Sequence, residues 1–401
     1  MNKLAILIIF CFSYANLLNG LDILEQEKFN QLDDKNIGLV INHTSLNKDG
    51  IHILELLSAY KNIHIQSIFT PEHGLKGSFS AGSPVLDIFN DSSGISIISL
   101  YGNRKEPTWS QISNLDYIIF DIQDIGSRYY TYVSTLTYIL NAASKAKVPV
   151  IVLDRPNPLG RKVFGPNIYT EFQSFVGMHS IPIRHGMTIG ELAIMINEQN
   201  WLPSEHKAEL IIYKMENWDK KLGYFSIPPS PNIPDFNTAL LYNGMCLLEG
   251  TNLSEGRGTN EPFLLIGSPW LNVAKNIEDL NALGLEEVVF LESNFVPISI
   301  KGMSEYPKYQ NELCHGIKIK VTNMYRLEPL KLAVSILKII YENHQNKYSF
   351  NNNNFISKLY GSNEIKINIL NKEPIEILYD DWKKDSEKFI DSGGLGFNIT
   401  L

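Results

Sequence analysis

The sequence DIQDIGSRYYTY at residues 121–132 decides the predicted fold, because it joins an apolar run, Tyr117–Phe120, to a helical pattern that begins near Thr131. Two carboxylates, an amide, an arginine and three tyrosines crowd this junction. In α/β proteins, the carboxyl ends of strands and the amino ends of helices meet in one crevice where ligands bind. A solvated loop with an aspartate cap would give the same local pattern. The rest of the chain must decide between these interpretations.

Short apolar runs alternate with helical segments through the first half of the chain. The expected strands occupy residues 37–41, 63–69, 95–100, 117–120, 148–153 and 209–214. Apolar residues at helical spacing predict helices at 51–60, 131–145 and 188–200, the last with a capping box of Thr188 and Glu191. Strands that are apolar throughout and separated by helices indicate a parallel sheet covered on both faces. We therefore predict an α/β fold with a Rossmann-like N-terminal domain.

A proline-rich segment, PPSPNIP at 228–234, cannot be a helix or a central strand, and we place a domain boundary there. The boundary separates a catalytic domain at 21–227 from a smaller α/β or α+β domain at 228–401. In the second domain we expect helices at 238–248 and 330–341. Alternating apolar runs stand at 296–300 and 316–321.

The composition of the 401 residues, 44% hydrophobic and 19% charged, is that of a globular protein. A net charge of -8 provides no basic surface for nucleic acid, so we expect no such partner. Residues 1–15 have the pattern of a signal peptide, with Lys3, an apolar run at 4–12 and small residues at Ser13 and Ala15. We expect export to the periplasm or the extracellular space, without stable membrane insertion after cleavage.

Polar side chains follow every expected strand of the first domain except the last. These clusters are Asn42–His43, Glu72–His73, Tyr101, Asp121 with Gln123 and Asp124, and Asp154–Arg155. Because the strands are expected to be parallel, their carboxyl ends lie at one edge of the sheet, which predicts a functional cleft there. Motifs of dinucleotide-binding proteins, P-loop NTPases, standard α/β-hydrolases and zincins are missing from the sequence, and we expect no cofactor.

The chemistry of these clusters is rich in carboxylates. Glu72 stands between Pro71 and Gly74, after a strand, where a partly desolvated carboxyl is suited to act as a general acid. Asp121 or Asp124 would supply a second carboxylate, and two carboxyl groups about 5–9.5 Å apart perform glycoside hydrolysis. The tyrosines at 129, 130 and 132 offer stacking faces for a sugar, and at least one is expected in the core.

Two other uses of these residues stay open. A divalent metal would need a group such as His73, Asp121, Asp124 and His185, but no pair has diagnostic spacing and we predict no metal site. Arginine forks bind carboxylate or phosphate, and the candidates for such a clamp are Arg128, Arg184 and Arg257. Cys246 and Cys314 permit one disulfide, although two buried free thiols are the default expectation.

Longer motifs extend through much of the chain. They are PEHGLKG at 71–77, AGSPV at 81–85, SLYG at 99–102, DIQDIGSRYYTYVSTL at 121–136, DRPNPLG at 154–160, SFVG at 174–177, RHGMTIGELA at 184–193, PPSPNIP at 228–234 and EGTNLSEGRGT at 249–259. In these motifs the chain resembles the bacterial exo-β-N-acetylmuramidases, a glycoside hydrolase family long known only as a domain of unknown function. The resemblance implies release of N-acetylmuramic acid from the non-reducing ends of peptidoglycan fragments, at a site between two domains.

The resemblance also implies roles for individual residues. It makes Glu72 the leading catalytic acid and places Asp121 and Asp124 near the sugar, where their position at a strand end already makes them further catalytic candidates. The residues expected around the sugar are His73, Gln123, Arg128, Tyr130, Asp154, Arg184 and Arg257. Expected substrates are MurNAc-GlcNAc saccharides or muropeptides, and an arginine must bind the lactyl carboxylate of muramic acid. The acetamido group of the substrate leaves a substrate-assisted route open beside retaining and inverting mechanisms.

One departure from the family pattern bears on the substrate. The family commonly reads Thr-x-Pro-Phe-Glu after GRGT, whereas residues 260–264 here read NEPFL. If the family glutamate contacts sugar, this chain has lost it or moved it to Glu261. The competing functional hypotheses are a non-catalytic protein that binds cell-wall sugars in the same cleft, and a metal-dependent hydrolase.

Overall fold

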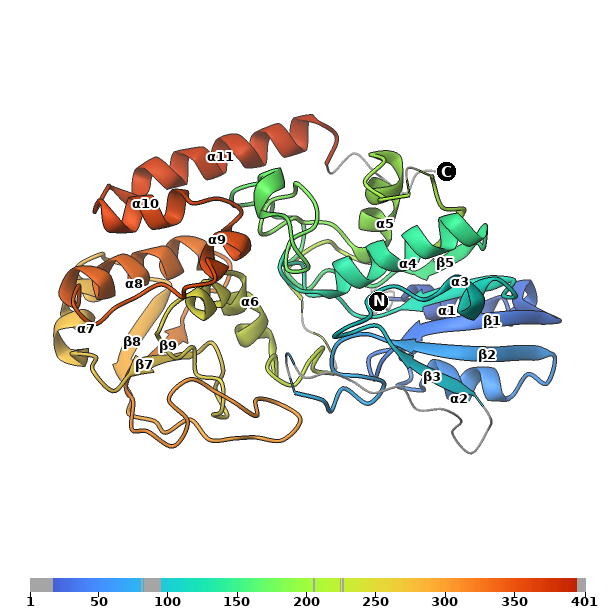
Figure 1. Cartoon of the computed structure of the whole chain (residues 1–401), viewed down its shortest axis with the longest axis horizontal. Helices are drawn as coiled ribbons and strands as arrows, with labels where there is room; N and C mark the ends of the chain where they lie inside the picture. Colours follow the sequence, from blue (N-terminus) through green and yellow to red (C-terminus); the bar gives the residue numbers. More distant parts are fainter. Residues whose placement is uncertain are drawn as a thin grey trace, which may run out of the picture.

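The computed structural model describes residues 17–80, 82, 95–204, 206–223, 225 and 227–394. The expected signal peptide at 1–15 lies outside the described residues. Figure 1 shows two α/β lobes side by side, with the first half of the chain in one lobe and α6 to α11 in the other. Within the described residues, no helix is both long and apolar enough to cross a membrane.

The first lobe is built on a parallel six-stranded sheet with the strand order β3-β2-β1-β4-β5-β6. This is the strand order of the Rossmann fold, so the predicted fold class is confirmed. The strands are β1 (Lys35–Ile41), β2 (Ile63–Thr70), β3 (Ser96–Ser99), β4 (Tyr117–Asp121), β5 (Val150–Leu153) and β6 (Leu210–Tyr213). The helices are α1 (Gly20–Gln26), η1 (Asn30–Leu32), α2 (Ile53–Ser58), α3 (Trp109–Ile112), α4 (Tyr132–Ala146), η2 (Thr170–Phe172) and α5 (Ile189–Glu198).

Both faces of the sheet are buried, which is why its strands are apolar at successive positions. Ile118 and Phe120 of β4 point into the large core that contains α4 and α5. Ile119, between them, points to the opposite face, where it packs with residues of α1 and α2. Thr188 caps α5 and forms the predicted capping box with Glu191. The alternation of faces along β4 therefore accounts for a continuous apolar run in the sequence.

The centre of the sheet contains the point where the strand order reverses. Strand β1 pairs with β2 on one side and with β4 on the other, and Ile41 lies opposite Asp121 in the register. Chain segments leaving β1 and β4 diverge here, which opens a crevice beyond their carboxyl ends. The stretch at 121–132 begins at this point and ends in the first turn of α4.

The second lobe contains an antiparallel sheet with the order β7-β9-β8. Its strands are β7 (Leu265–Ser268), β8 (Val288–Glu292) and β9 (His315–Val321). The helices are α6 (Phe236–Met245), η3 (Cys246–Gly250), α7 (Val273–Asn281), α8 (Pro329–Asn343), α9 (Phe355–Tyr360), α10 (Glu364–Leu370) and α11 (Ile375–Asp391). A smaller C-terminal domain with this mixed content was predicted. The alternating run at 296–300 forms no strand, only isolated bridges near its two ends.

One hydrophobic core continues from the first lobe into the second. It includes Tyr129 and Leu136 from the first lobe, and Leu241 of α6 and Leu337 of α8 from the second. The two lobes are therefore packed together rather than tethered. Cys246 and Cys314 are both buried free thiols.

Candidate active site

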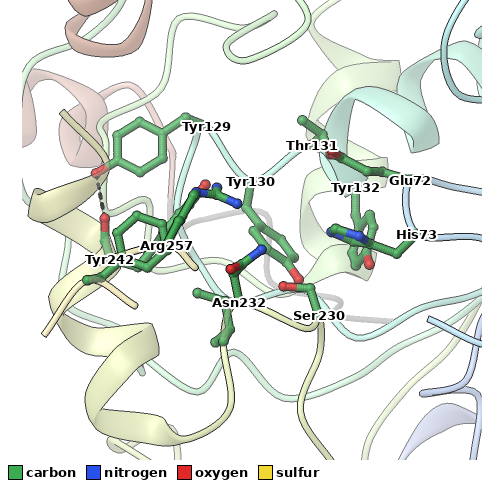
Figure 2. A pocket seen from close by; sticks show the side chains of 12 residues that line it. Glu72, His73, Tyr129, Tyr130, Thr131, Tyr132, Ser230, Asn232, Tyr242 and Arg257 are labelled. Atoms are coloured by element: carbon green, nitrogen blue, oxygen red, sulfur yellow. Dashed lines mark hydrogen bonds between the residues drawn. The ribbon is translucent and has the colours of Figure 1, made fainter. Parts of the chain in front are cut away.

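A narrow pocket of about 50 Å³ lies between the two lobes, at the edge where the parallel strands end. Its lining comes from the loop after β2, from the stretch before α4, from the proline-rich segment and from the second lobe (Figure 2). The lining residues are Glu72, His73, Tyr129, Tyr130, Thr131, Tyr132, Ser230, Asn232, Ile233, Tyr242, Arg257 and Phe263. Of the ten predicted site residues, the structure brings Glu72, His73, Tyr130 and Arg257 together here.

Glu72 is held in the pocket by two donors that carry no charge. The hydroxyl of Thr131 donates to Oε2 at 2.9 Å, and the backbone N–H of Gly82 donates to Oε1 at 3.0 Å. Burial, together with the charge of Glu72, raises the pKa of the neighbouring Tyr101 above its usual value, so that phenol stays protonated. A carboxyl oriented by neutral donors is free to exchange a proton with a ligand, which an arginine-paired carboxylate does less readily.

His73, directly after Glu72, is buried with a left-handed backbone at φ 71°. Its Nδ1 lies 2.6 Å from the carbonyl oxygen of Phe79. A carbonyl only accepts hydrogen bonds, so Nδ1 carries the proton and Nε2 is the acceptor in the neutral ring. Burial lowers the pKa of His73 below its ordinary value and keeps the ring neutral. The pocket therefore contains a carboxyl beside an imidazole whose lone pair is available.

The back of the pocket is aromatic. Tyr242 makes edge-to-face contacts with Tyr129, Tyr130 and Phe263, at centroid distances of 5.5, 6.0 and 4.9 Å. Tyr129 is fixed further because its hydroxyl donates to the carbonyl of Asn243 at 2.5 Å. Tyr129, Tyr130 and Tyr132 all belong to the core as well as to the pocket lining, so the expectation that at least one is a core residue is confirmed.

Arg257 reaches the same pocket from the second lobe. Its Nη2 lies 2.8 Å from Glu249 Oε1, while Nε makes no hydrogen bond although Glu255 Oε1 is 3.6 Å away. The guanidinium also lies over the ring of Phe263, 5.1 Å from its centroid. Burial alone would lower the pKa of Arg257, but the two glutamates outweigh it and raise the pKa above its ordinary value. The pocket thus contains a permanent cation with part of its fork unoccupied.

Asp121 lies away from the pocket lining and is completely buried. Arg155 binds it with both arms, from Nε to Oδ1 at 2.5 Å and from Nη2 to Oδ2 at 2.9 Å. Arg155 also donates to the carbonyl of Leu46. This ion pair ties the end of β4 to the end of β5 and leaves no face of the carboxylate for a ligand.

Asp124 is also buried outside the lining residues. Its Oδ2 accepts the N–H of Gly126 at 2.7 Å, while Oδ1 has no hydrogen-bond partner. Burial raises the pKa of Asp124 to about 7. The neighbouring Gln123 uses its amide group to donate to the carbonyls of Asp124 and Pro156, both at 2.7 Å. Asp124 thus stabilises the turn before α4, and Gln123 joins this turn to the segment after β5.

Three further residues that were predicted for the site form hydrogen bonds with the protein backbone instead. Arg128 donates to four carbonyls, two of the first lobe and two, Leu359 and Tyr360, of the second. Arg184 donates to the carbonyl of Leu159. Asp154 accepts from the hydroxyl of Thr188 and from two backbone N–H groups, one of them at the start of α5. None of the three lines the pocket.

Other sequence-based alternatives can be placed as well. Glu261 pairs with Lys318 and does not line the pocket, whereas Phe263 from the same altered motif does. No group of three His, Cys, Asp or Glu side chains suited to a metal ion occurs within the described part of the chain. His185 and Asp124, two of the metal candidates, are 3.9 Å apart and buried, and burial lowers the pKa of His185 to about 3.

Several lining residues were not identified from the sequence. They are Thr131, Ser230, Asn232, Ile233, Tyr242 and Phe263. Ser230 and Asn232 lie in the proline-rich motif, which predicted a domain boundary and carried part of the family resemblance but indicated no site residue, and Phe263 lies just beyond the GRGT motif. The pair of polar residues among prolines could have indicated these two site residues, because a rigid non-helical segment presents its side chains at low entropic cost.

Similarity to known proteins extends over both lobes. Residues 37–237 match the family model described as exo-β-N-acetylmuramidase NamZ, N-terminal, and residues 240–392 match its C-terminal counterpart. The peptidoglycan β-N-acetylmuramidase NamZ of Bacillus subtilis (strain 168) is 36% identical over 376 residues, which is 92% of this chain and 88% of that protein.

Two crystal structures of DUF1343 family proteins from Bacteroides fragilis NCTC 9343 have the same fold. Their TM-scores are 0.85 and 0.76, at 27% and 29% identity, and each comparison covers 96% of this chain and 99% of the other. The family models cover most of the chain, and the Bacillus relative is similar along nearly its whole length. This chain belongs to the exo-β-N-acetylmuramidase NamZ family.

Proposed function

We propose that this protein is an exo-acting glycosidase that releases N-acetylmuramic acid from the non-reducing ends of peptidoglycan fragments, with Glu72 as the general acid. The family supports the reaction class. The observation that carries the assignment of the site is the placement of Glu72 in a pocket between the lobes, held by Thr131 and Gly82 and facing a cavity that also contains Arg257.

Glu72 donates its proton to the glycosidic oxygen as the bond to the muramic acid C1 breaks. The leaving sugar departs as an alcohol, and the carboxylate that remains still accepts from Thr131 and from the N–H of Gly82. These two hydrogen bonds orient the carboxyl before the reaction and stabilise its charge after it.

Arg257 binds the lactyl carboxylate that distinguishes muramic acid from glucosamine. Its Nε is buried and faces Glu255 at 3.6 Å and its Nη2 donates to Glu249, whereas its Nη1 makes no hydrogen bond within the described part of the chain. A carboxylate that enters the pocket forms a charge-assisted hydrogen bond with this free arm. Arg128 is not proposed for this role, because its Nη1 and Nη2 already donate to four backbone carbonyls.

Exo action follows from the closed back of the pocket. Tyr129, Tyr242 and Phe263 are buried against one another there, and the hydroxyl of Tyr129 is bonded to the backbone of α6. A glycan chain cannot continue through this wall, so only a terminal sugar fits.

Either His73 or the acetamido group of the substrate supplies the second catalytic group. Glu72 is the single carboxylate among the described lining residues, so Asp121 and Asp124 are not part of the proposed catalytic set. The neutral His73, with Nε2 as an acceptor, is placed to activate water. The acetamido oxygen of the substrate is the other candidate, and retaining and inverting outcomes both stay open.

The substrates we propose are MurNAc-GlcNAc saccharides or muropeptides outside the cytoplasm, in the periplasm or the extracellular space. The basis for export is the signal-like sequence of residues 1–15.

Incubation of the purified protein with a nitrophenyl N-acetylmuramide and, separately, with the matching glucosaminide tests the assignment. We expect release of nitrophenol from the muramide and little from the glucosaminide, because only the muramide places a carboxylate against Arg257. Release from the glucosaminide alone contradicts the specificity. Tight binding of muropeptides without turnover selects the alternative of a sugar-binding protein.

A further inference from the structure

The pocket between the lobes is too small to admit a sugar in the form that the structure shows. Its volume is about 50 Å³, whereas typical small-molecule sites have roughly 300–1,000 Å³. Separation of the lobes as rigid bodies would break the hydrophobic core that runs through both of them. It would also break the hydrogen bonds from Arg128 to carbonyls of each lobe. Entry of a sugar therefore requires a local movement in the wall of the pocket.

Two walls of the pocket are loops, and a turn of the second lobe joins them. One loop follows β2 and carries Glu72, and the other is the proline-rich segment with Asn232. The turn occupies residues 300–305, and we call it the latch. The backbone N–H groups of Ile300 and Ser304 each donate to the carbonyl of the other residue, at 2.8 and 2.9 Å. The latch is thus a compact unit closed by its own hydrogen bonds.

The latch rests on the loop that follows Glu72. Gly302 has a φ of 80°, and a Cβ at this position would collide with the carbonyl oxygen of Ser78. The hydroxyl of Ser80 donates to Glu305 Oε1 at 3.1 Å. Ser80 is only 1% exposed, although Ser78 on the same loop is exposed. A close backbone contact and one hydrogen bond therefore hold the latch against this wall.

The latch also holds the opposite wall, and its base lies beside Arg257. Asn232 lines the pocket and donates from Nδ2 to the carbonyl of Met303 at 2.8 Å. Just before the latch, the N–H of Ile298 donates to the carbonyl of Gly258 at 2.9 Å. Gly258 directly follows Arg257 in the chain. Movement of the latch would therefore free both loop walls and disturb the backbone next to the arginine of the pocket.

Weak interactions fasten the latch to the two walls. Within the described residues they include two side-chain hydrogen bonds and the glycine contact, and single hydrogen bonds contribute little net free energy. We propose that the latch holds the pocket closed and is released to let the terminal sugar enter and the product leave. Loops that open and close in this way control access to many active sites. The proposal rests on the proposed function for the identity of the ligand and adds the movement that admits it.

Gly302→Ala tests the latch, because the new Cβ pushes the turn away from Ser78. Ser80→Cys supplies the report, since it places a thiol at a buried position against the latch. Labelling of that thiol by a small thiol reagent is followed by peptide mass spectrometry, with and without Gly302→Ala. We expect labelling to become about tenfold faster or more when Gly302→Ala is added.

Gly50→Ala is the matched control. Gly50 has a φ of 78°, but a Cβ there would have no neighbouring atom within 4 Å, so the substitution adds backbone strain without a collision. Labelling of the Ser80→Cys protein should change by less than about twofold when Gly50→Ala is added. The buried thiol of Cys246 is measured in the same samples and should stay unlabelled, which shows that the faster reaction is not global unfolding.

Stopped-flow binding of N-acetylmuramic acid connects the latch to the ligand. Gly302→Ala should raise the association and dissociation rate constants together, because the latch must be released for both steps. Glu305→Ala removes only the hydrogen bond to Ser80 and should raise both by about two- to fivefold. This second variant keeps the test decisive if Gly302→Ala unfolds the protein.

Equal labelling rates with Gly302→Ala and with Gly50→Ala overturn the proposal. Unchanged rate constants for N-acetylmuramic acid in both Gly302→Ala and Glu305→Ala also overturn it, because the latch would then not control access to the pocket. Failure of the proposed function is distinguishable, since the unmodified protein would then not bind N-acetylmuramic acid, whereas the difference in labelling would remain.

Discussion

Glu72 follows β2 and Asp121 ends β4 of the same parallel sheet, yet the structure gives the two carboxyl groups opposite surroundings. Asp121 is fully buried and bound by both arms of Arg155. Glu72 lines a pocket and has uncharged hydrogen-bond partners, which are the hydroxyls of Thr131 and Tyr101 and the backbone N–H of Gly82. The hydrogen-bond partners of a carboxylate at a strand end therefore indicate whether it is catalytic. A carboxylate that is paired with a fixed arginine cannot exchange a proton with a ligand.

Arg128 and Arg257 also differ in their surroundings. Arg128, in the most crowded motif, spends its fork on four backbone carbonyls and joins the lobes. Arg257, in the second lobe, is held by Glu249 and Glu255 and lines the pocket, which Arg128 does not. The first part of the stretch at 121–132 is therefore a structural joint, and its end contributes Tyr129, Tyr130, Thr131 and Tyr132 to the pocket lining.

The largest expected effect is on turnover at Glu72. Glu72→Gln should lower kcat/KM for MurNAc-GlcNAc by about 10²–10⁴-fold, because an amide cannot donate an acidic proton to the leaving oxygen. The melting temperature should change little, since the amide oxygen can still accept one of the two hydrogen bonds. Steady-state kinetics measures the loss of turnover, and thermal unfolding of the same preparation measures the melting temperature. Near-normal turnover would show that Glu72 is not the general acid.

Arg155→Ala should act on stability instead. It leaves the carboxylate of Asp121 buried without its partner, and such a loss costs about 3–5 kcal/mol. Urea unfolding followed by circular dichroism measures the free energy. A change below about 1 kcal/mol would mean that water or another group replaces Arg155, against the view of Asp121 as a sealed structural carboxylate.

A smaller, selective effect is expected at Arg257. Arg257→Lys keeps the positive charge but loses the fork, which should weaken inhibition by N-acetylmuramic acid by about tenfold. Inhibition by N-acetylglucosamine, which has no lactyl carboxylate, should not change. Competition assays with the two sugars give both inhibition constants, and a parallel loss for both would show that Arg257 does not recognise the carboxylate.

A separate effect is expected on the pH dependence of stability at Asp124. Burial raises its pKa in the folded protein to about 7 from 3.8, so the folded state retains a proton that the unfolded state releases. The stability contributed by this proton is present below pH 3.8 and is lost as the pH rises to about 7.

Asp124→Asn cannot titrate, so its free energy of unfolding should fall less between pH 4 and pH 7 than that of the unmodified protein. Urea unfolding at several pH values gives the two slopes. Identical slopes would show that Asp124 is ionised in the folded state. Turnover of the variant at pH 6 should stay close to normal, because Asp124 does not line the pocket.

Much of the fold could be predicted from the sequence because the parallel sheet is buried on both faces. Each of its strands is therefore an apolar run, and the six expected strands all occur. The antiparallel sheet of the second lobe was harder, because β8 alternates between buried and exposed residues and includes Val289 and Leu291 on the exposed side.

The candidate site was only partly predictable, since its partners are distant in the sequence. Glu72 meets Thr131 across 59 positions, and Asp121 meets Arg155 across 34. Local pattern indicates that polar groups gather at one edge, but it cannot tell which of them pair with each other. The aromatic wall of Tyr242 and Phe263 arises from packing between the lobes, which no local motif reports.

The central claim, that Glu72 protonates the leaving group, is tested most directly by the dependence of the Glu72→Gln defect on that group. kcat/KM of the variant and of the unmodified protein is measured with MurNAc-GlcNAc and with a dinitrophenyl N-acetylmuramide, whose leaving group departs without a proton. We expect a loss of about 10²–10⁴-fold on the disaccharide and a far smaller loss on the dinitrophenyl substrate. Equal losses on both substrates would contradict it.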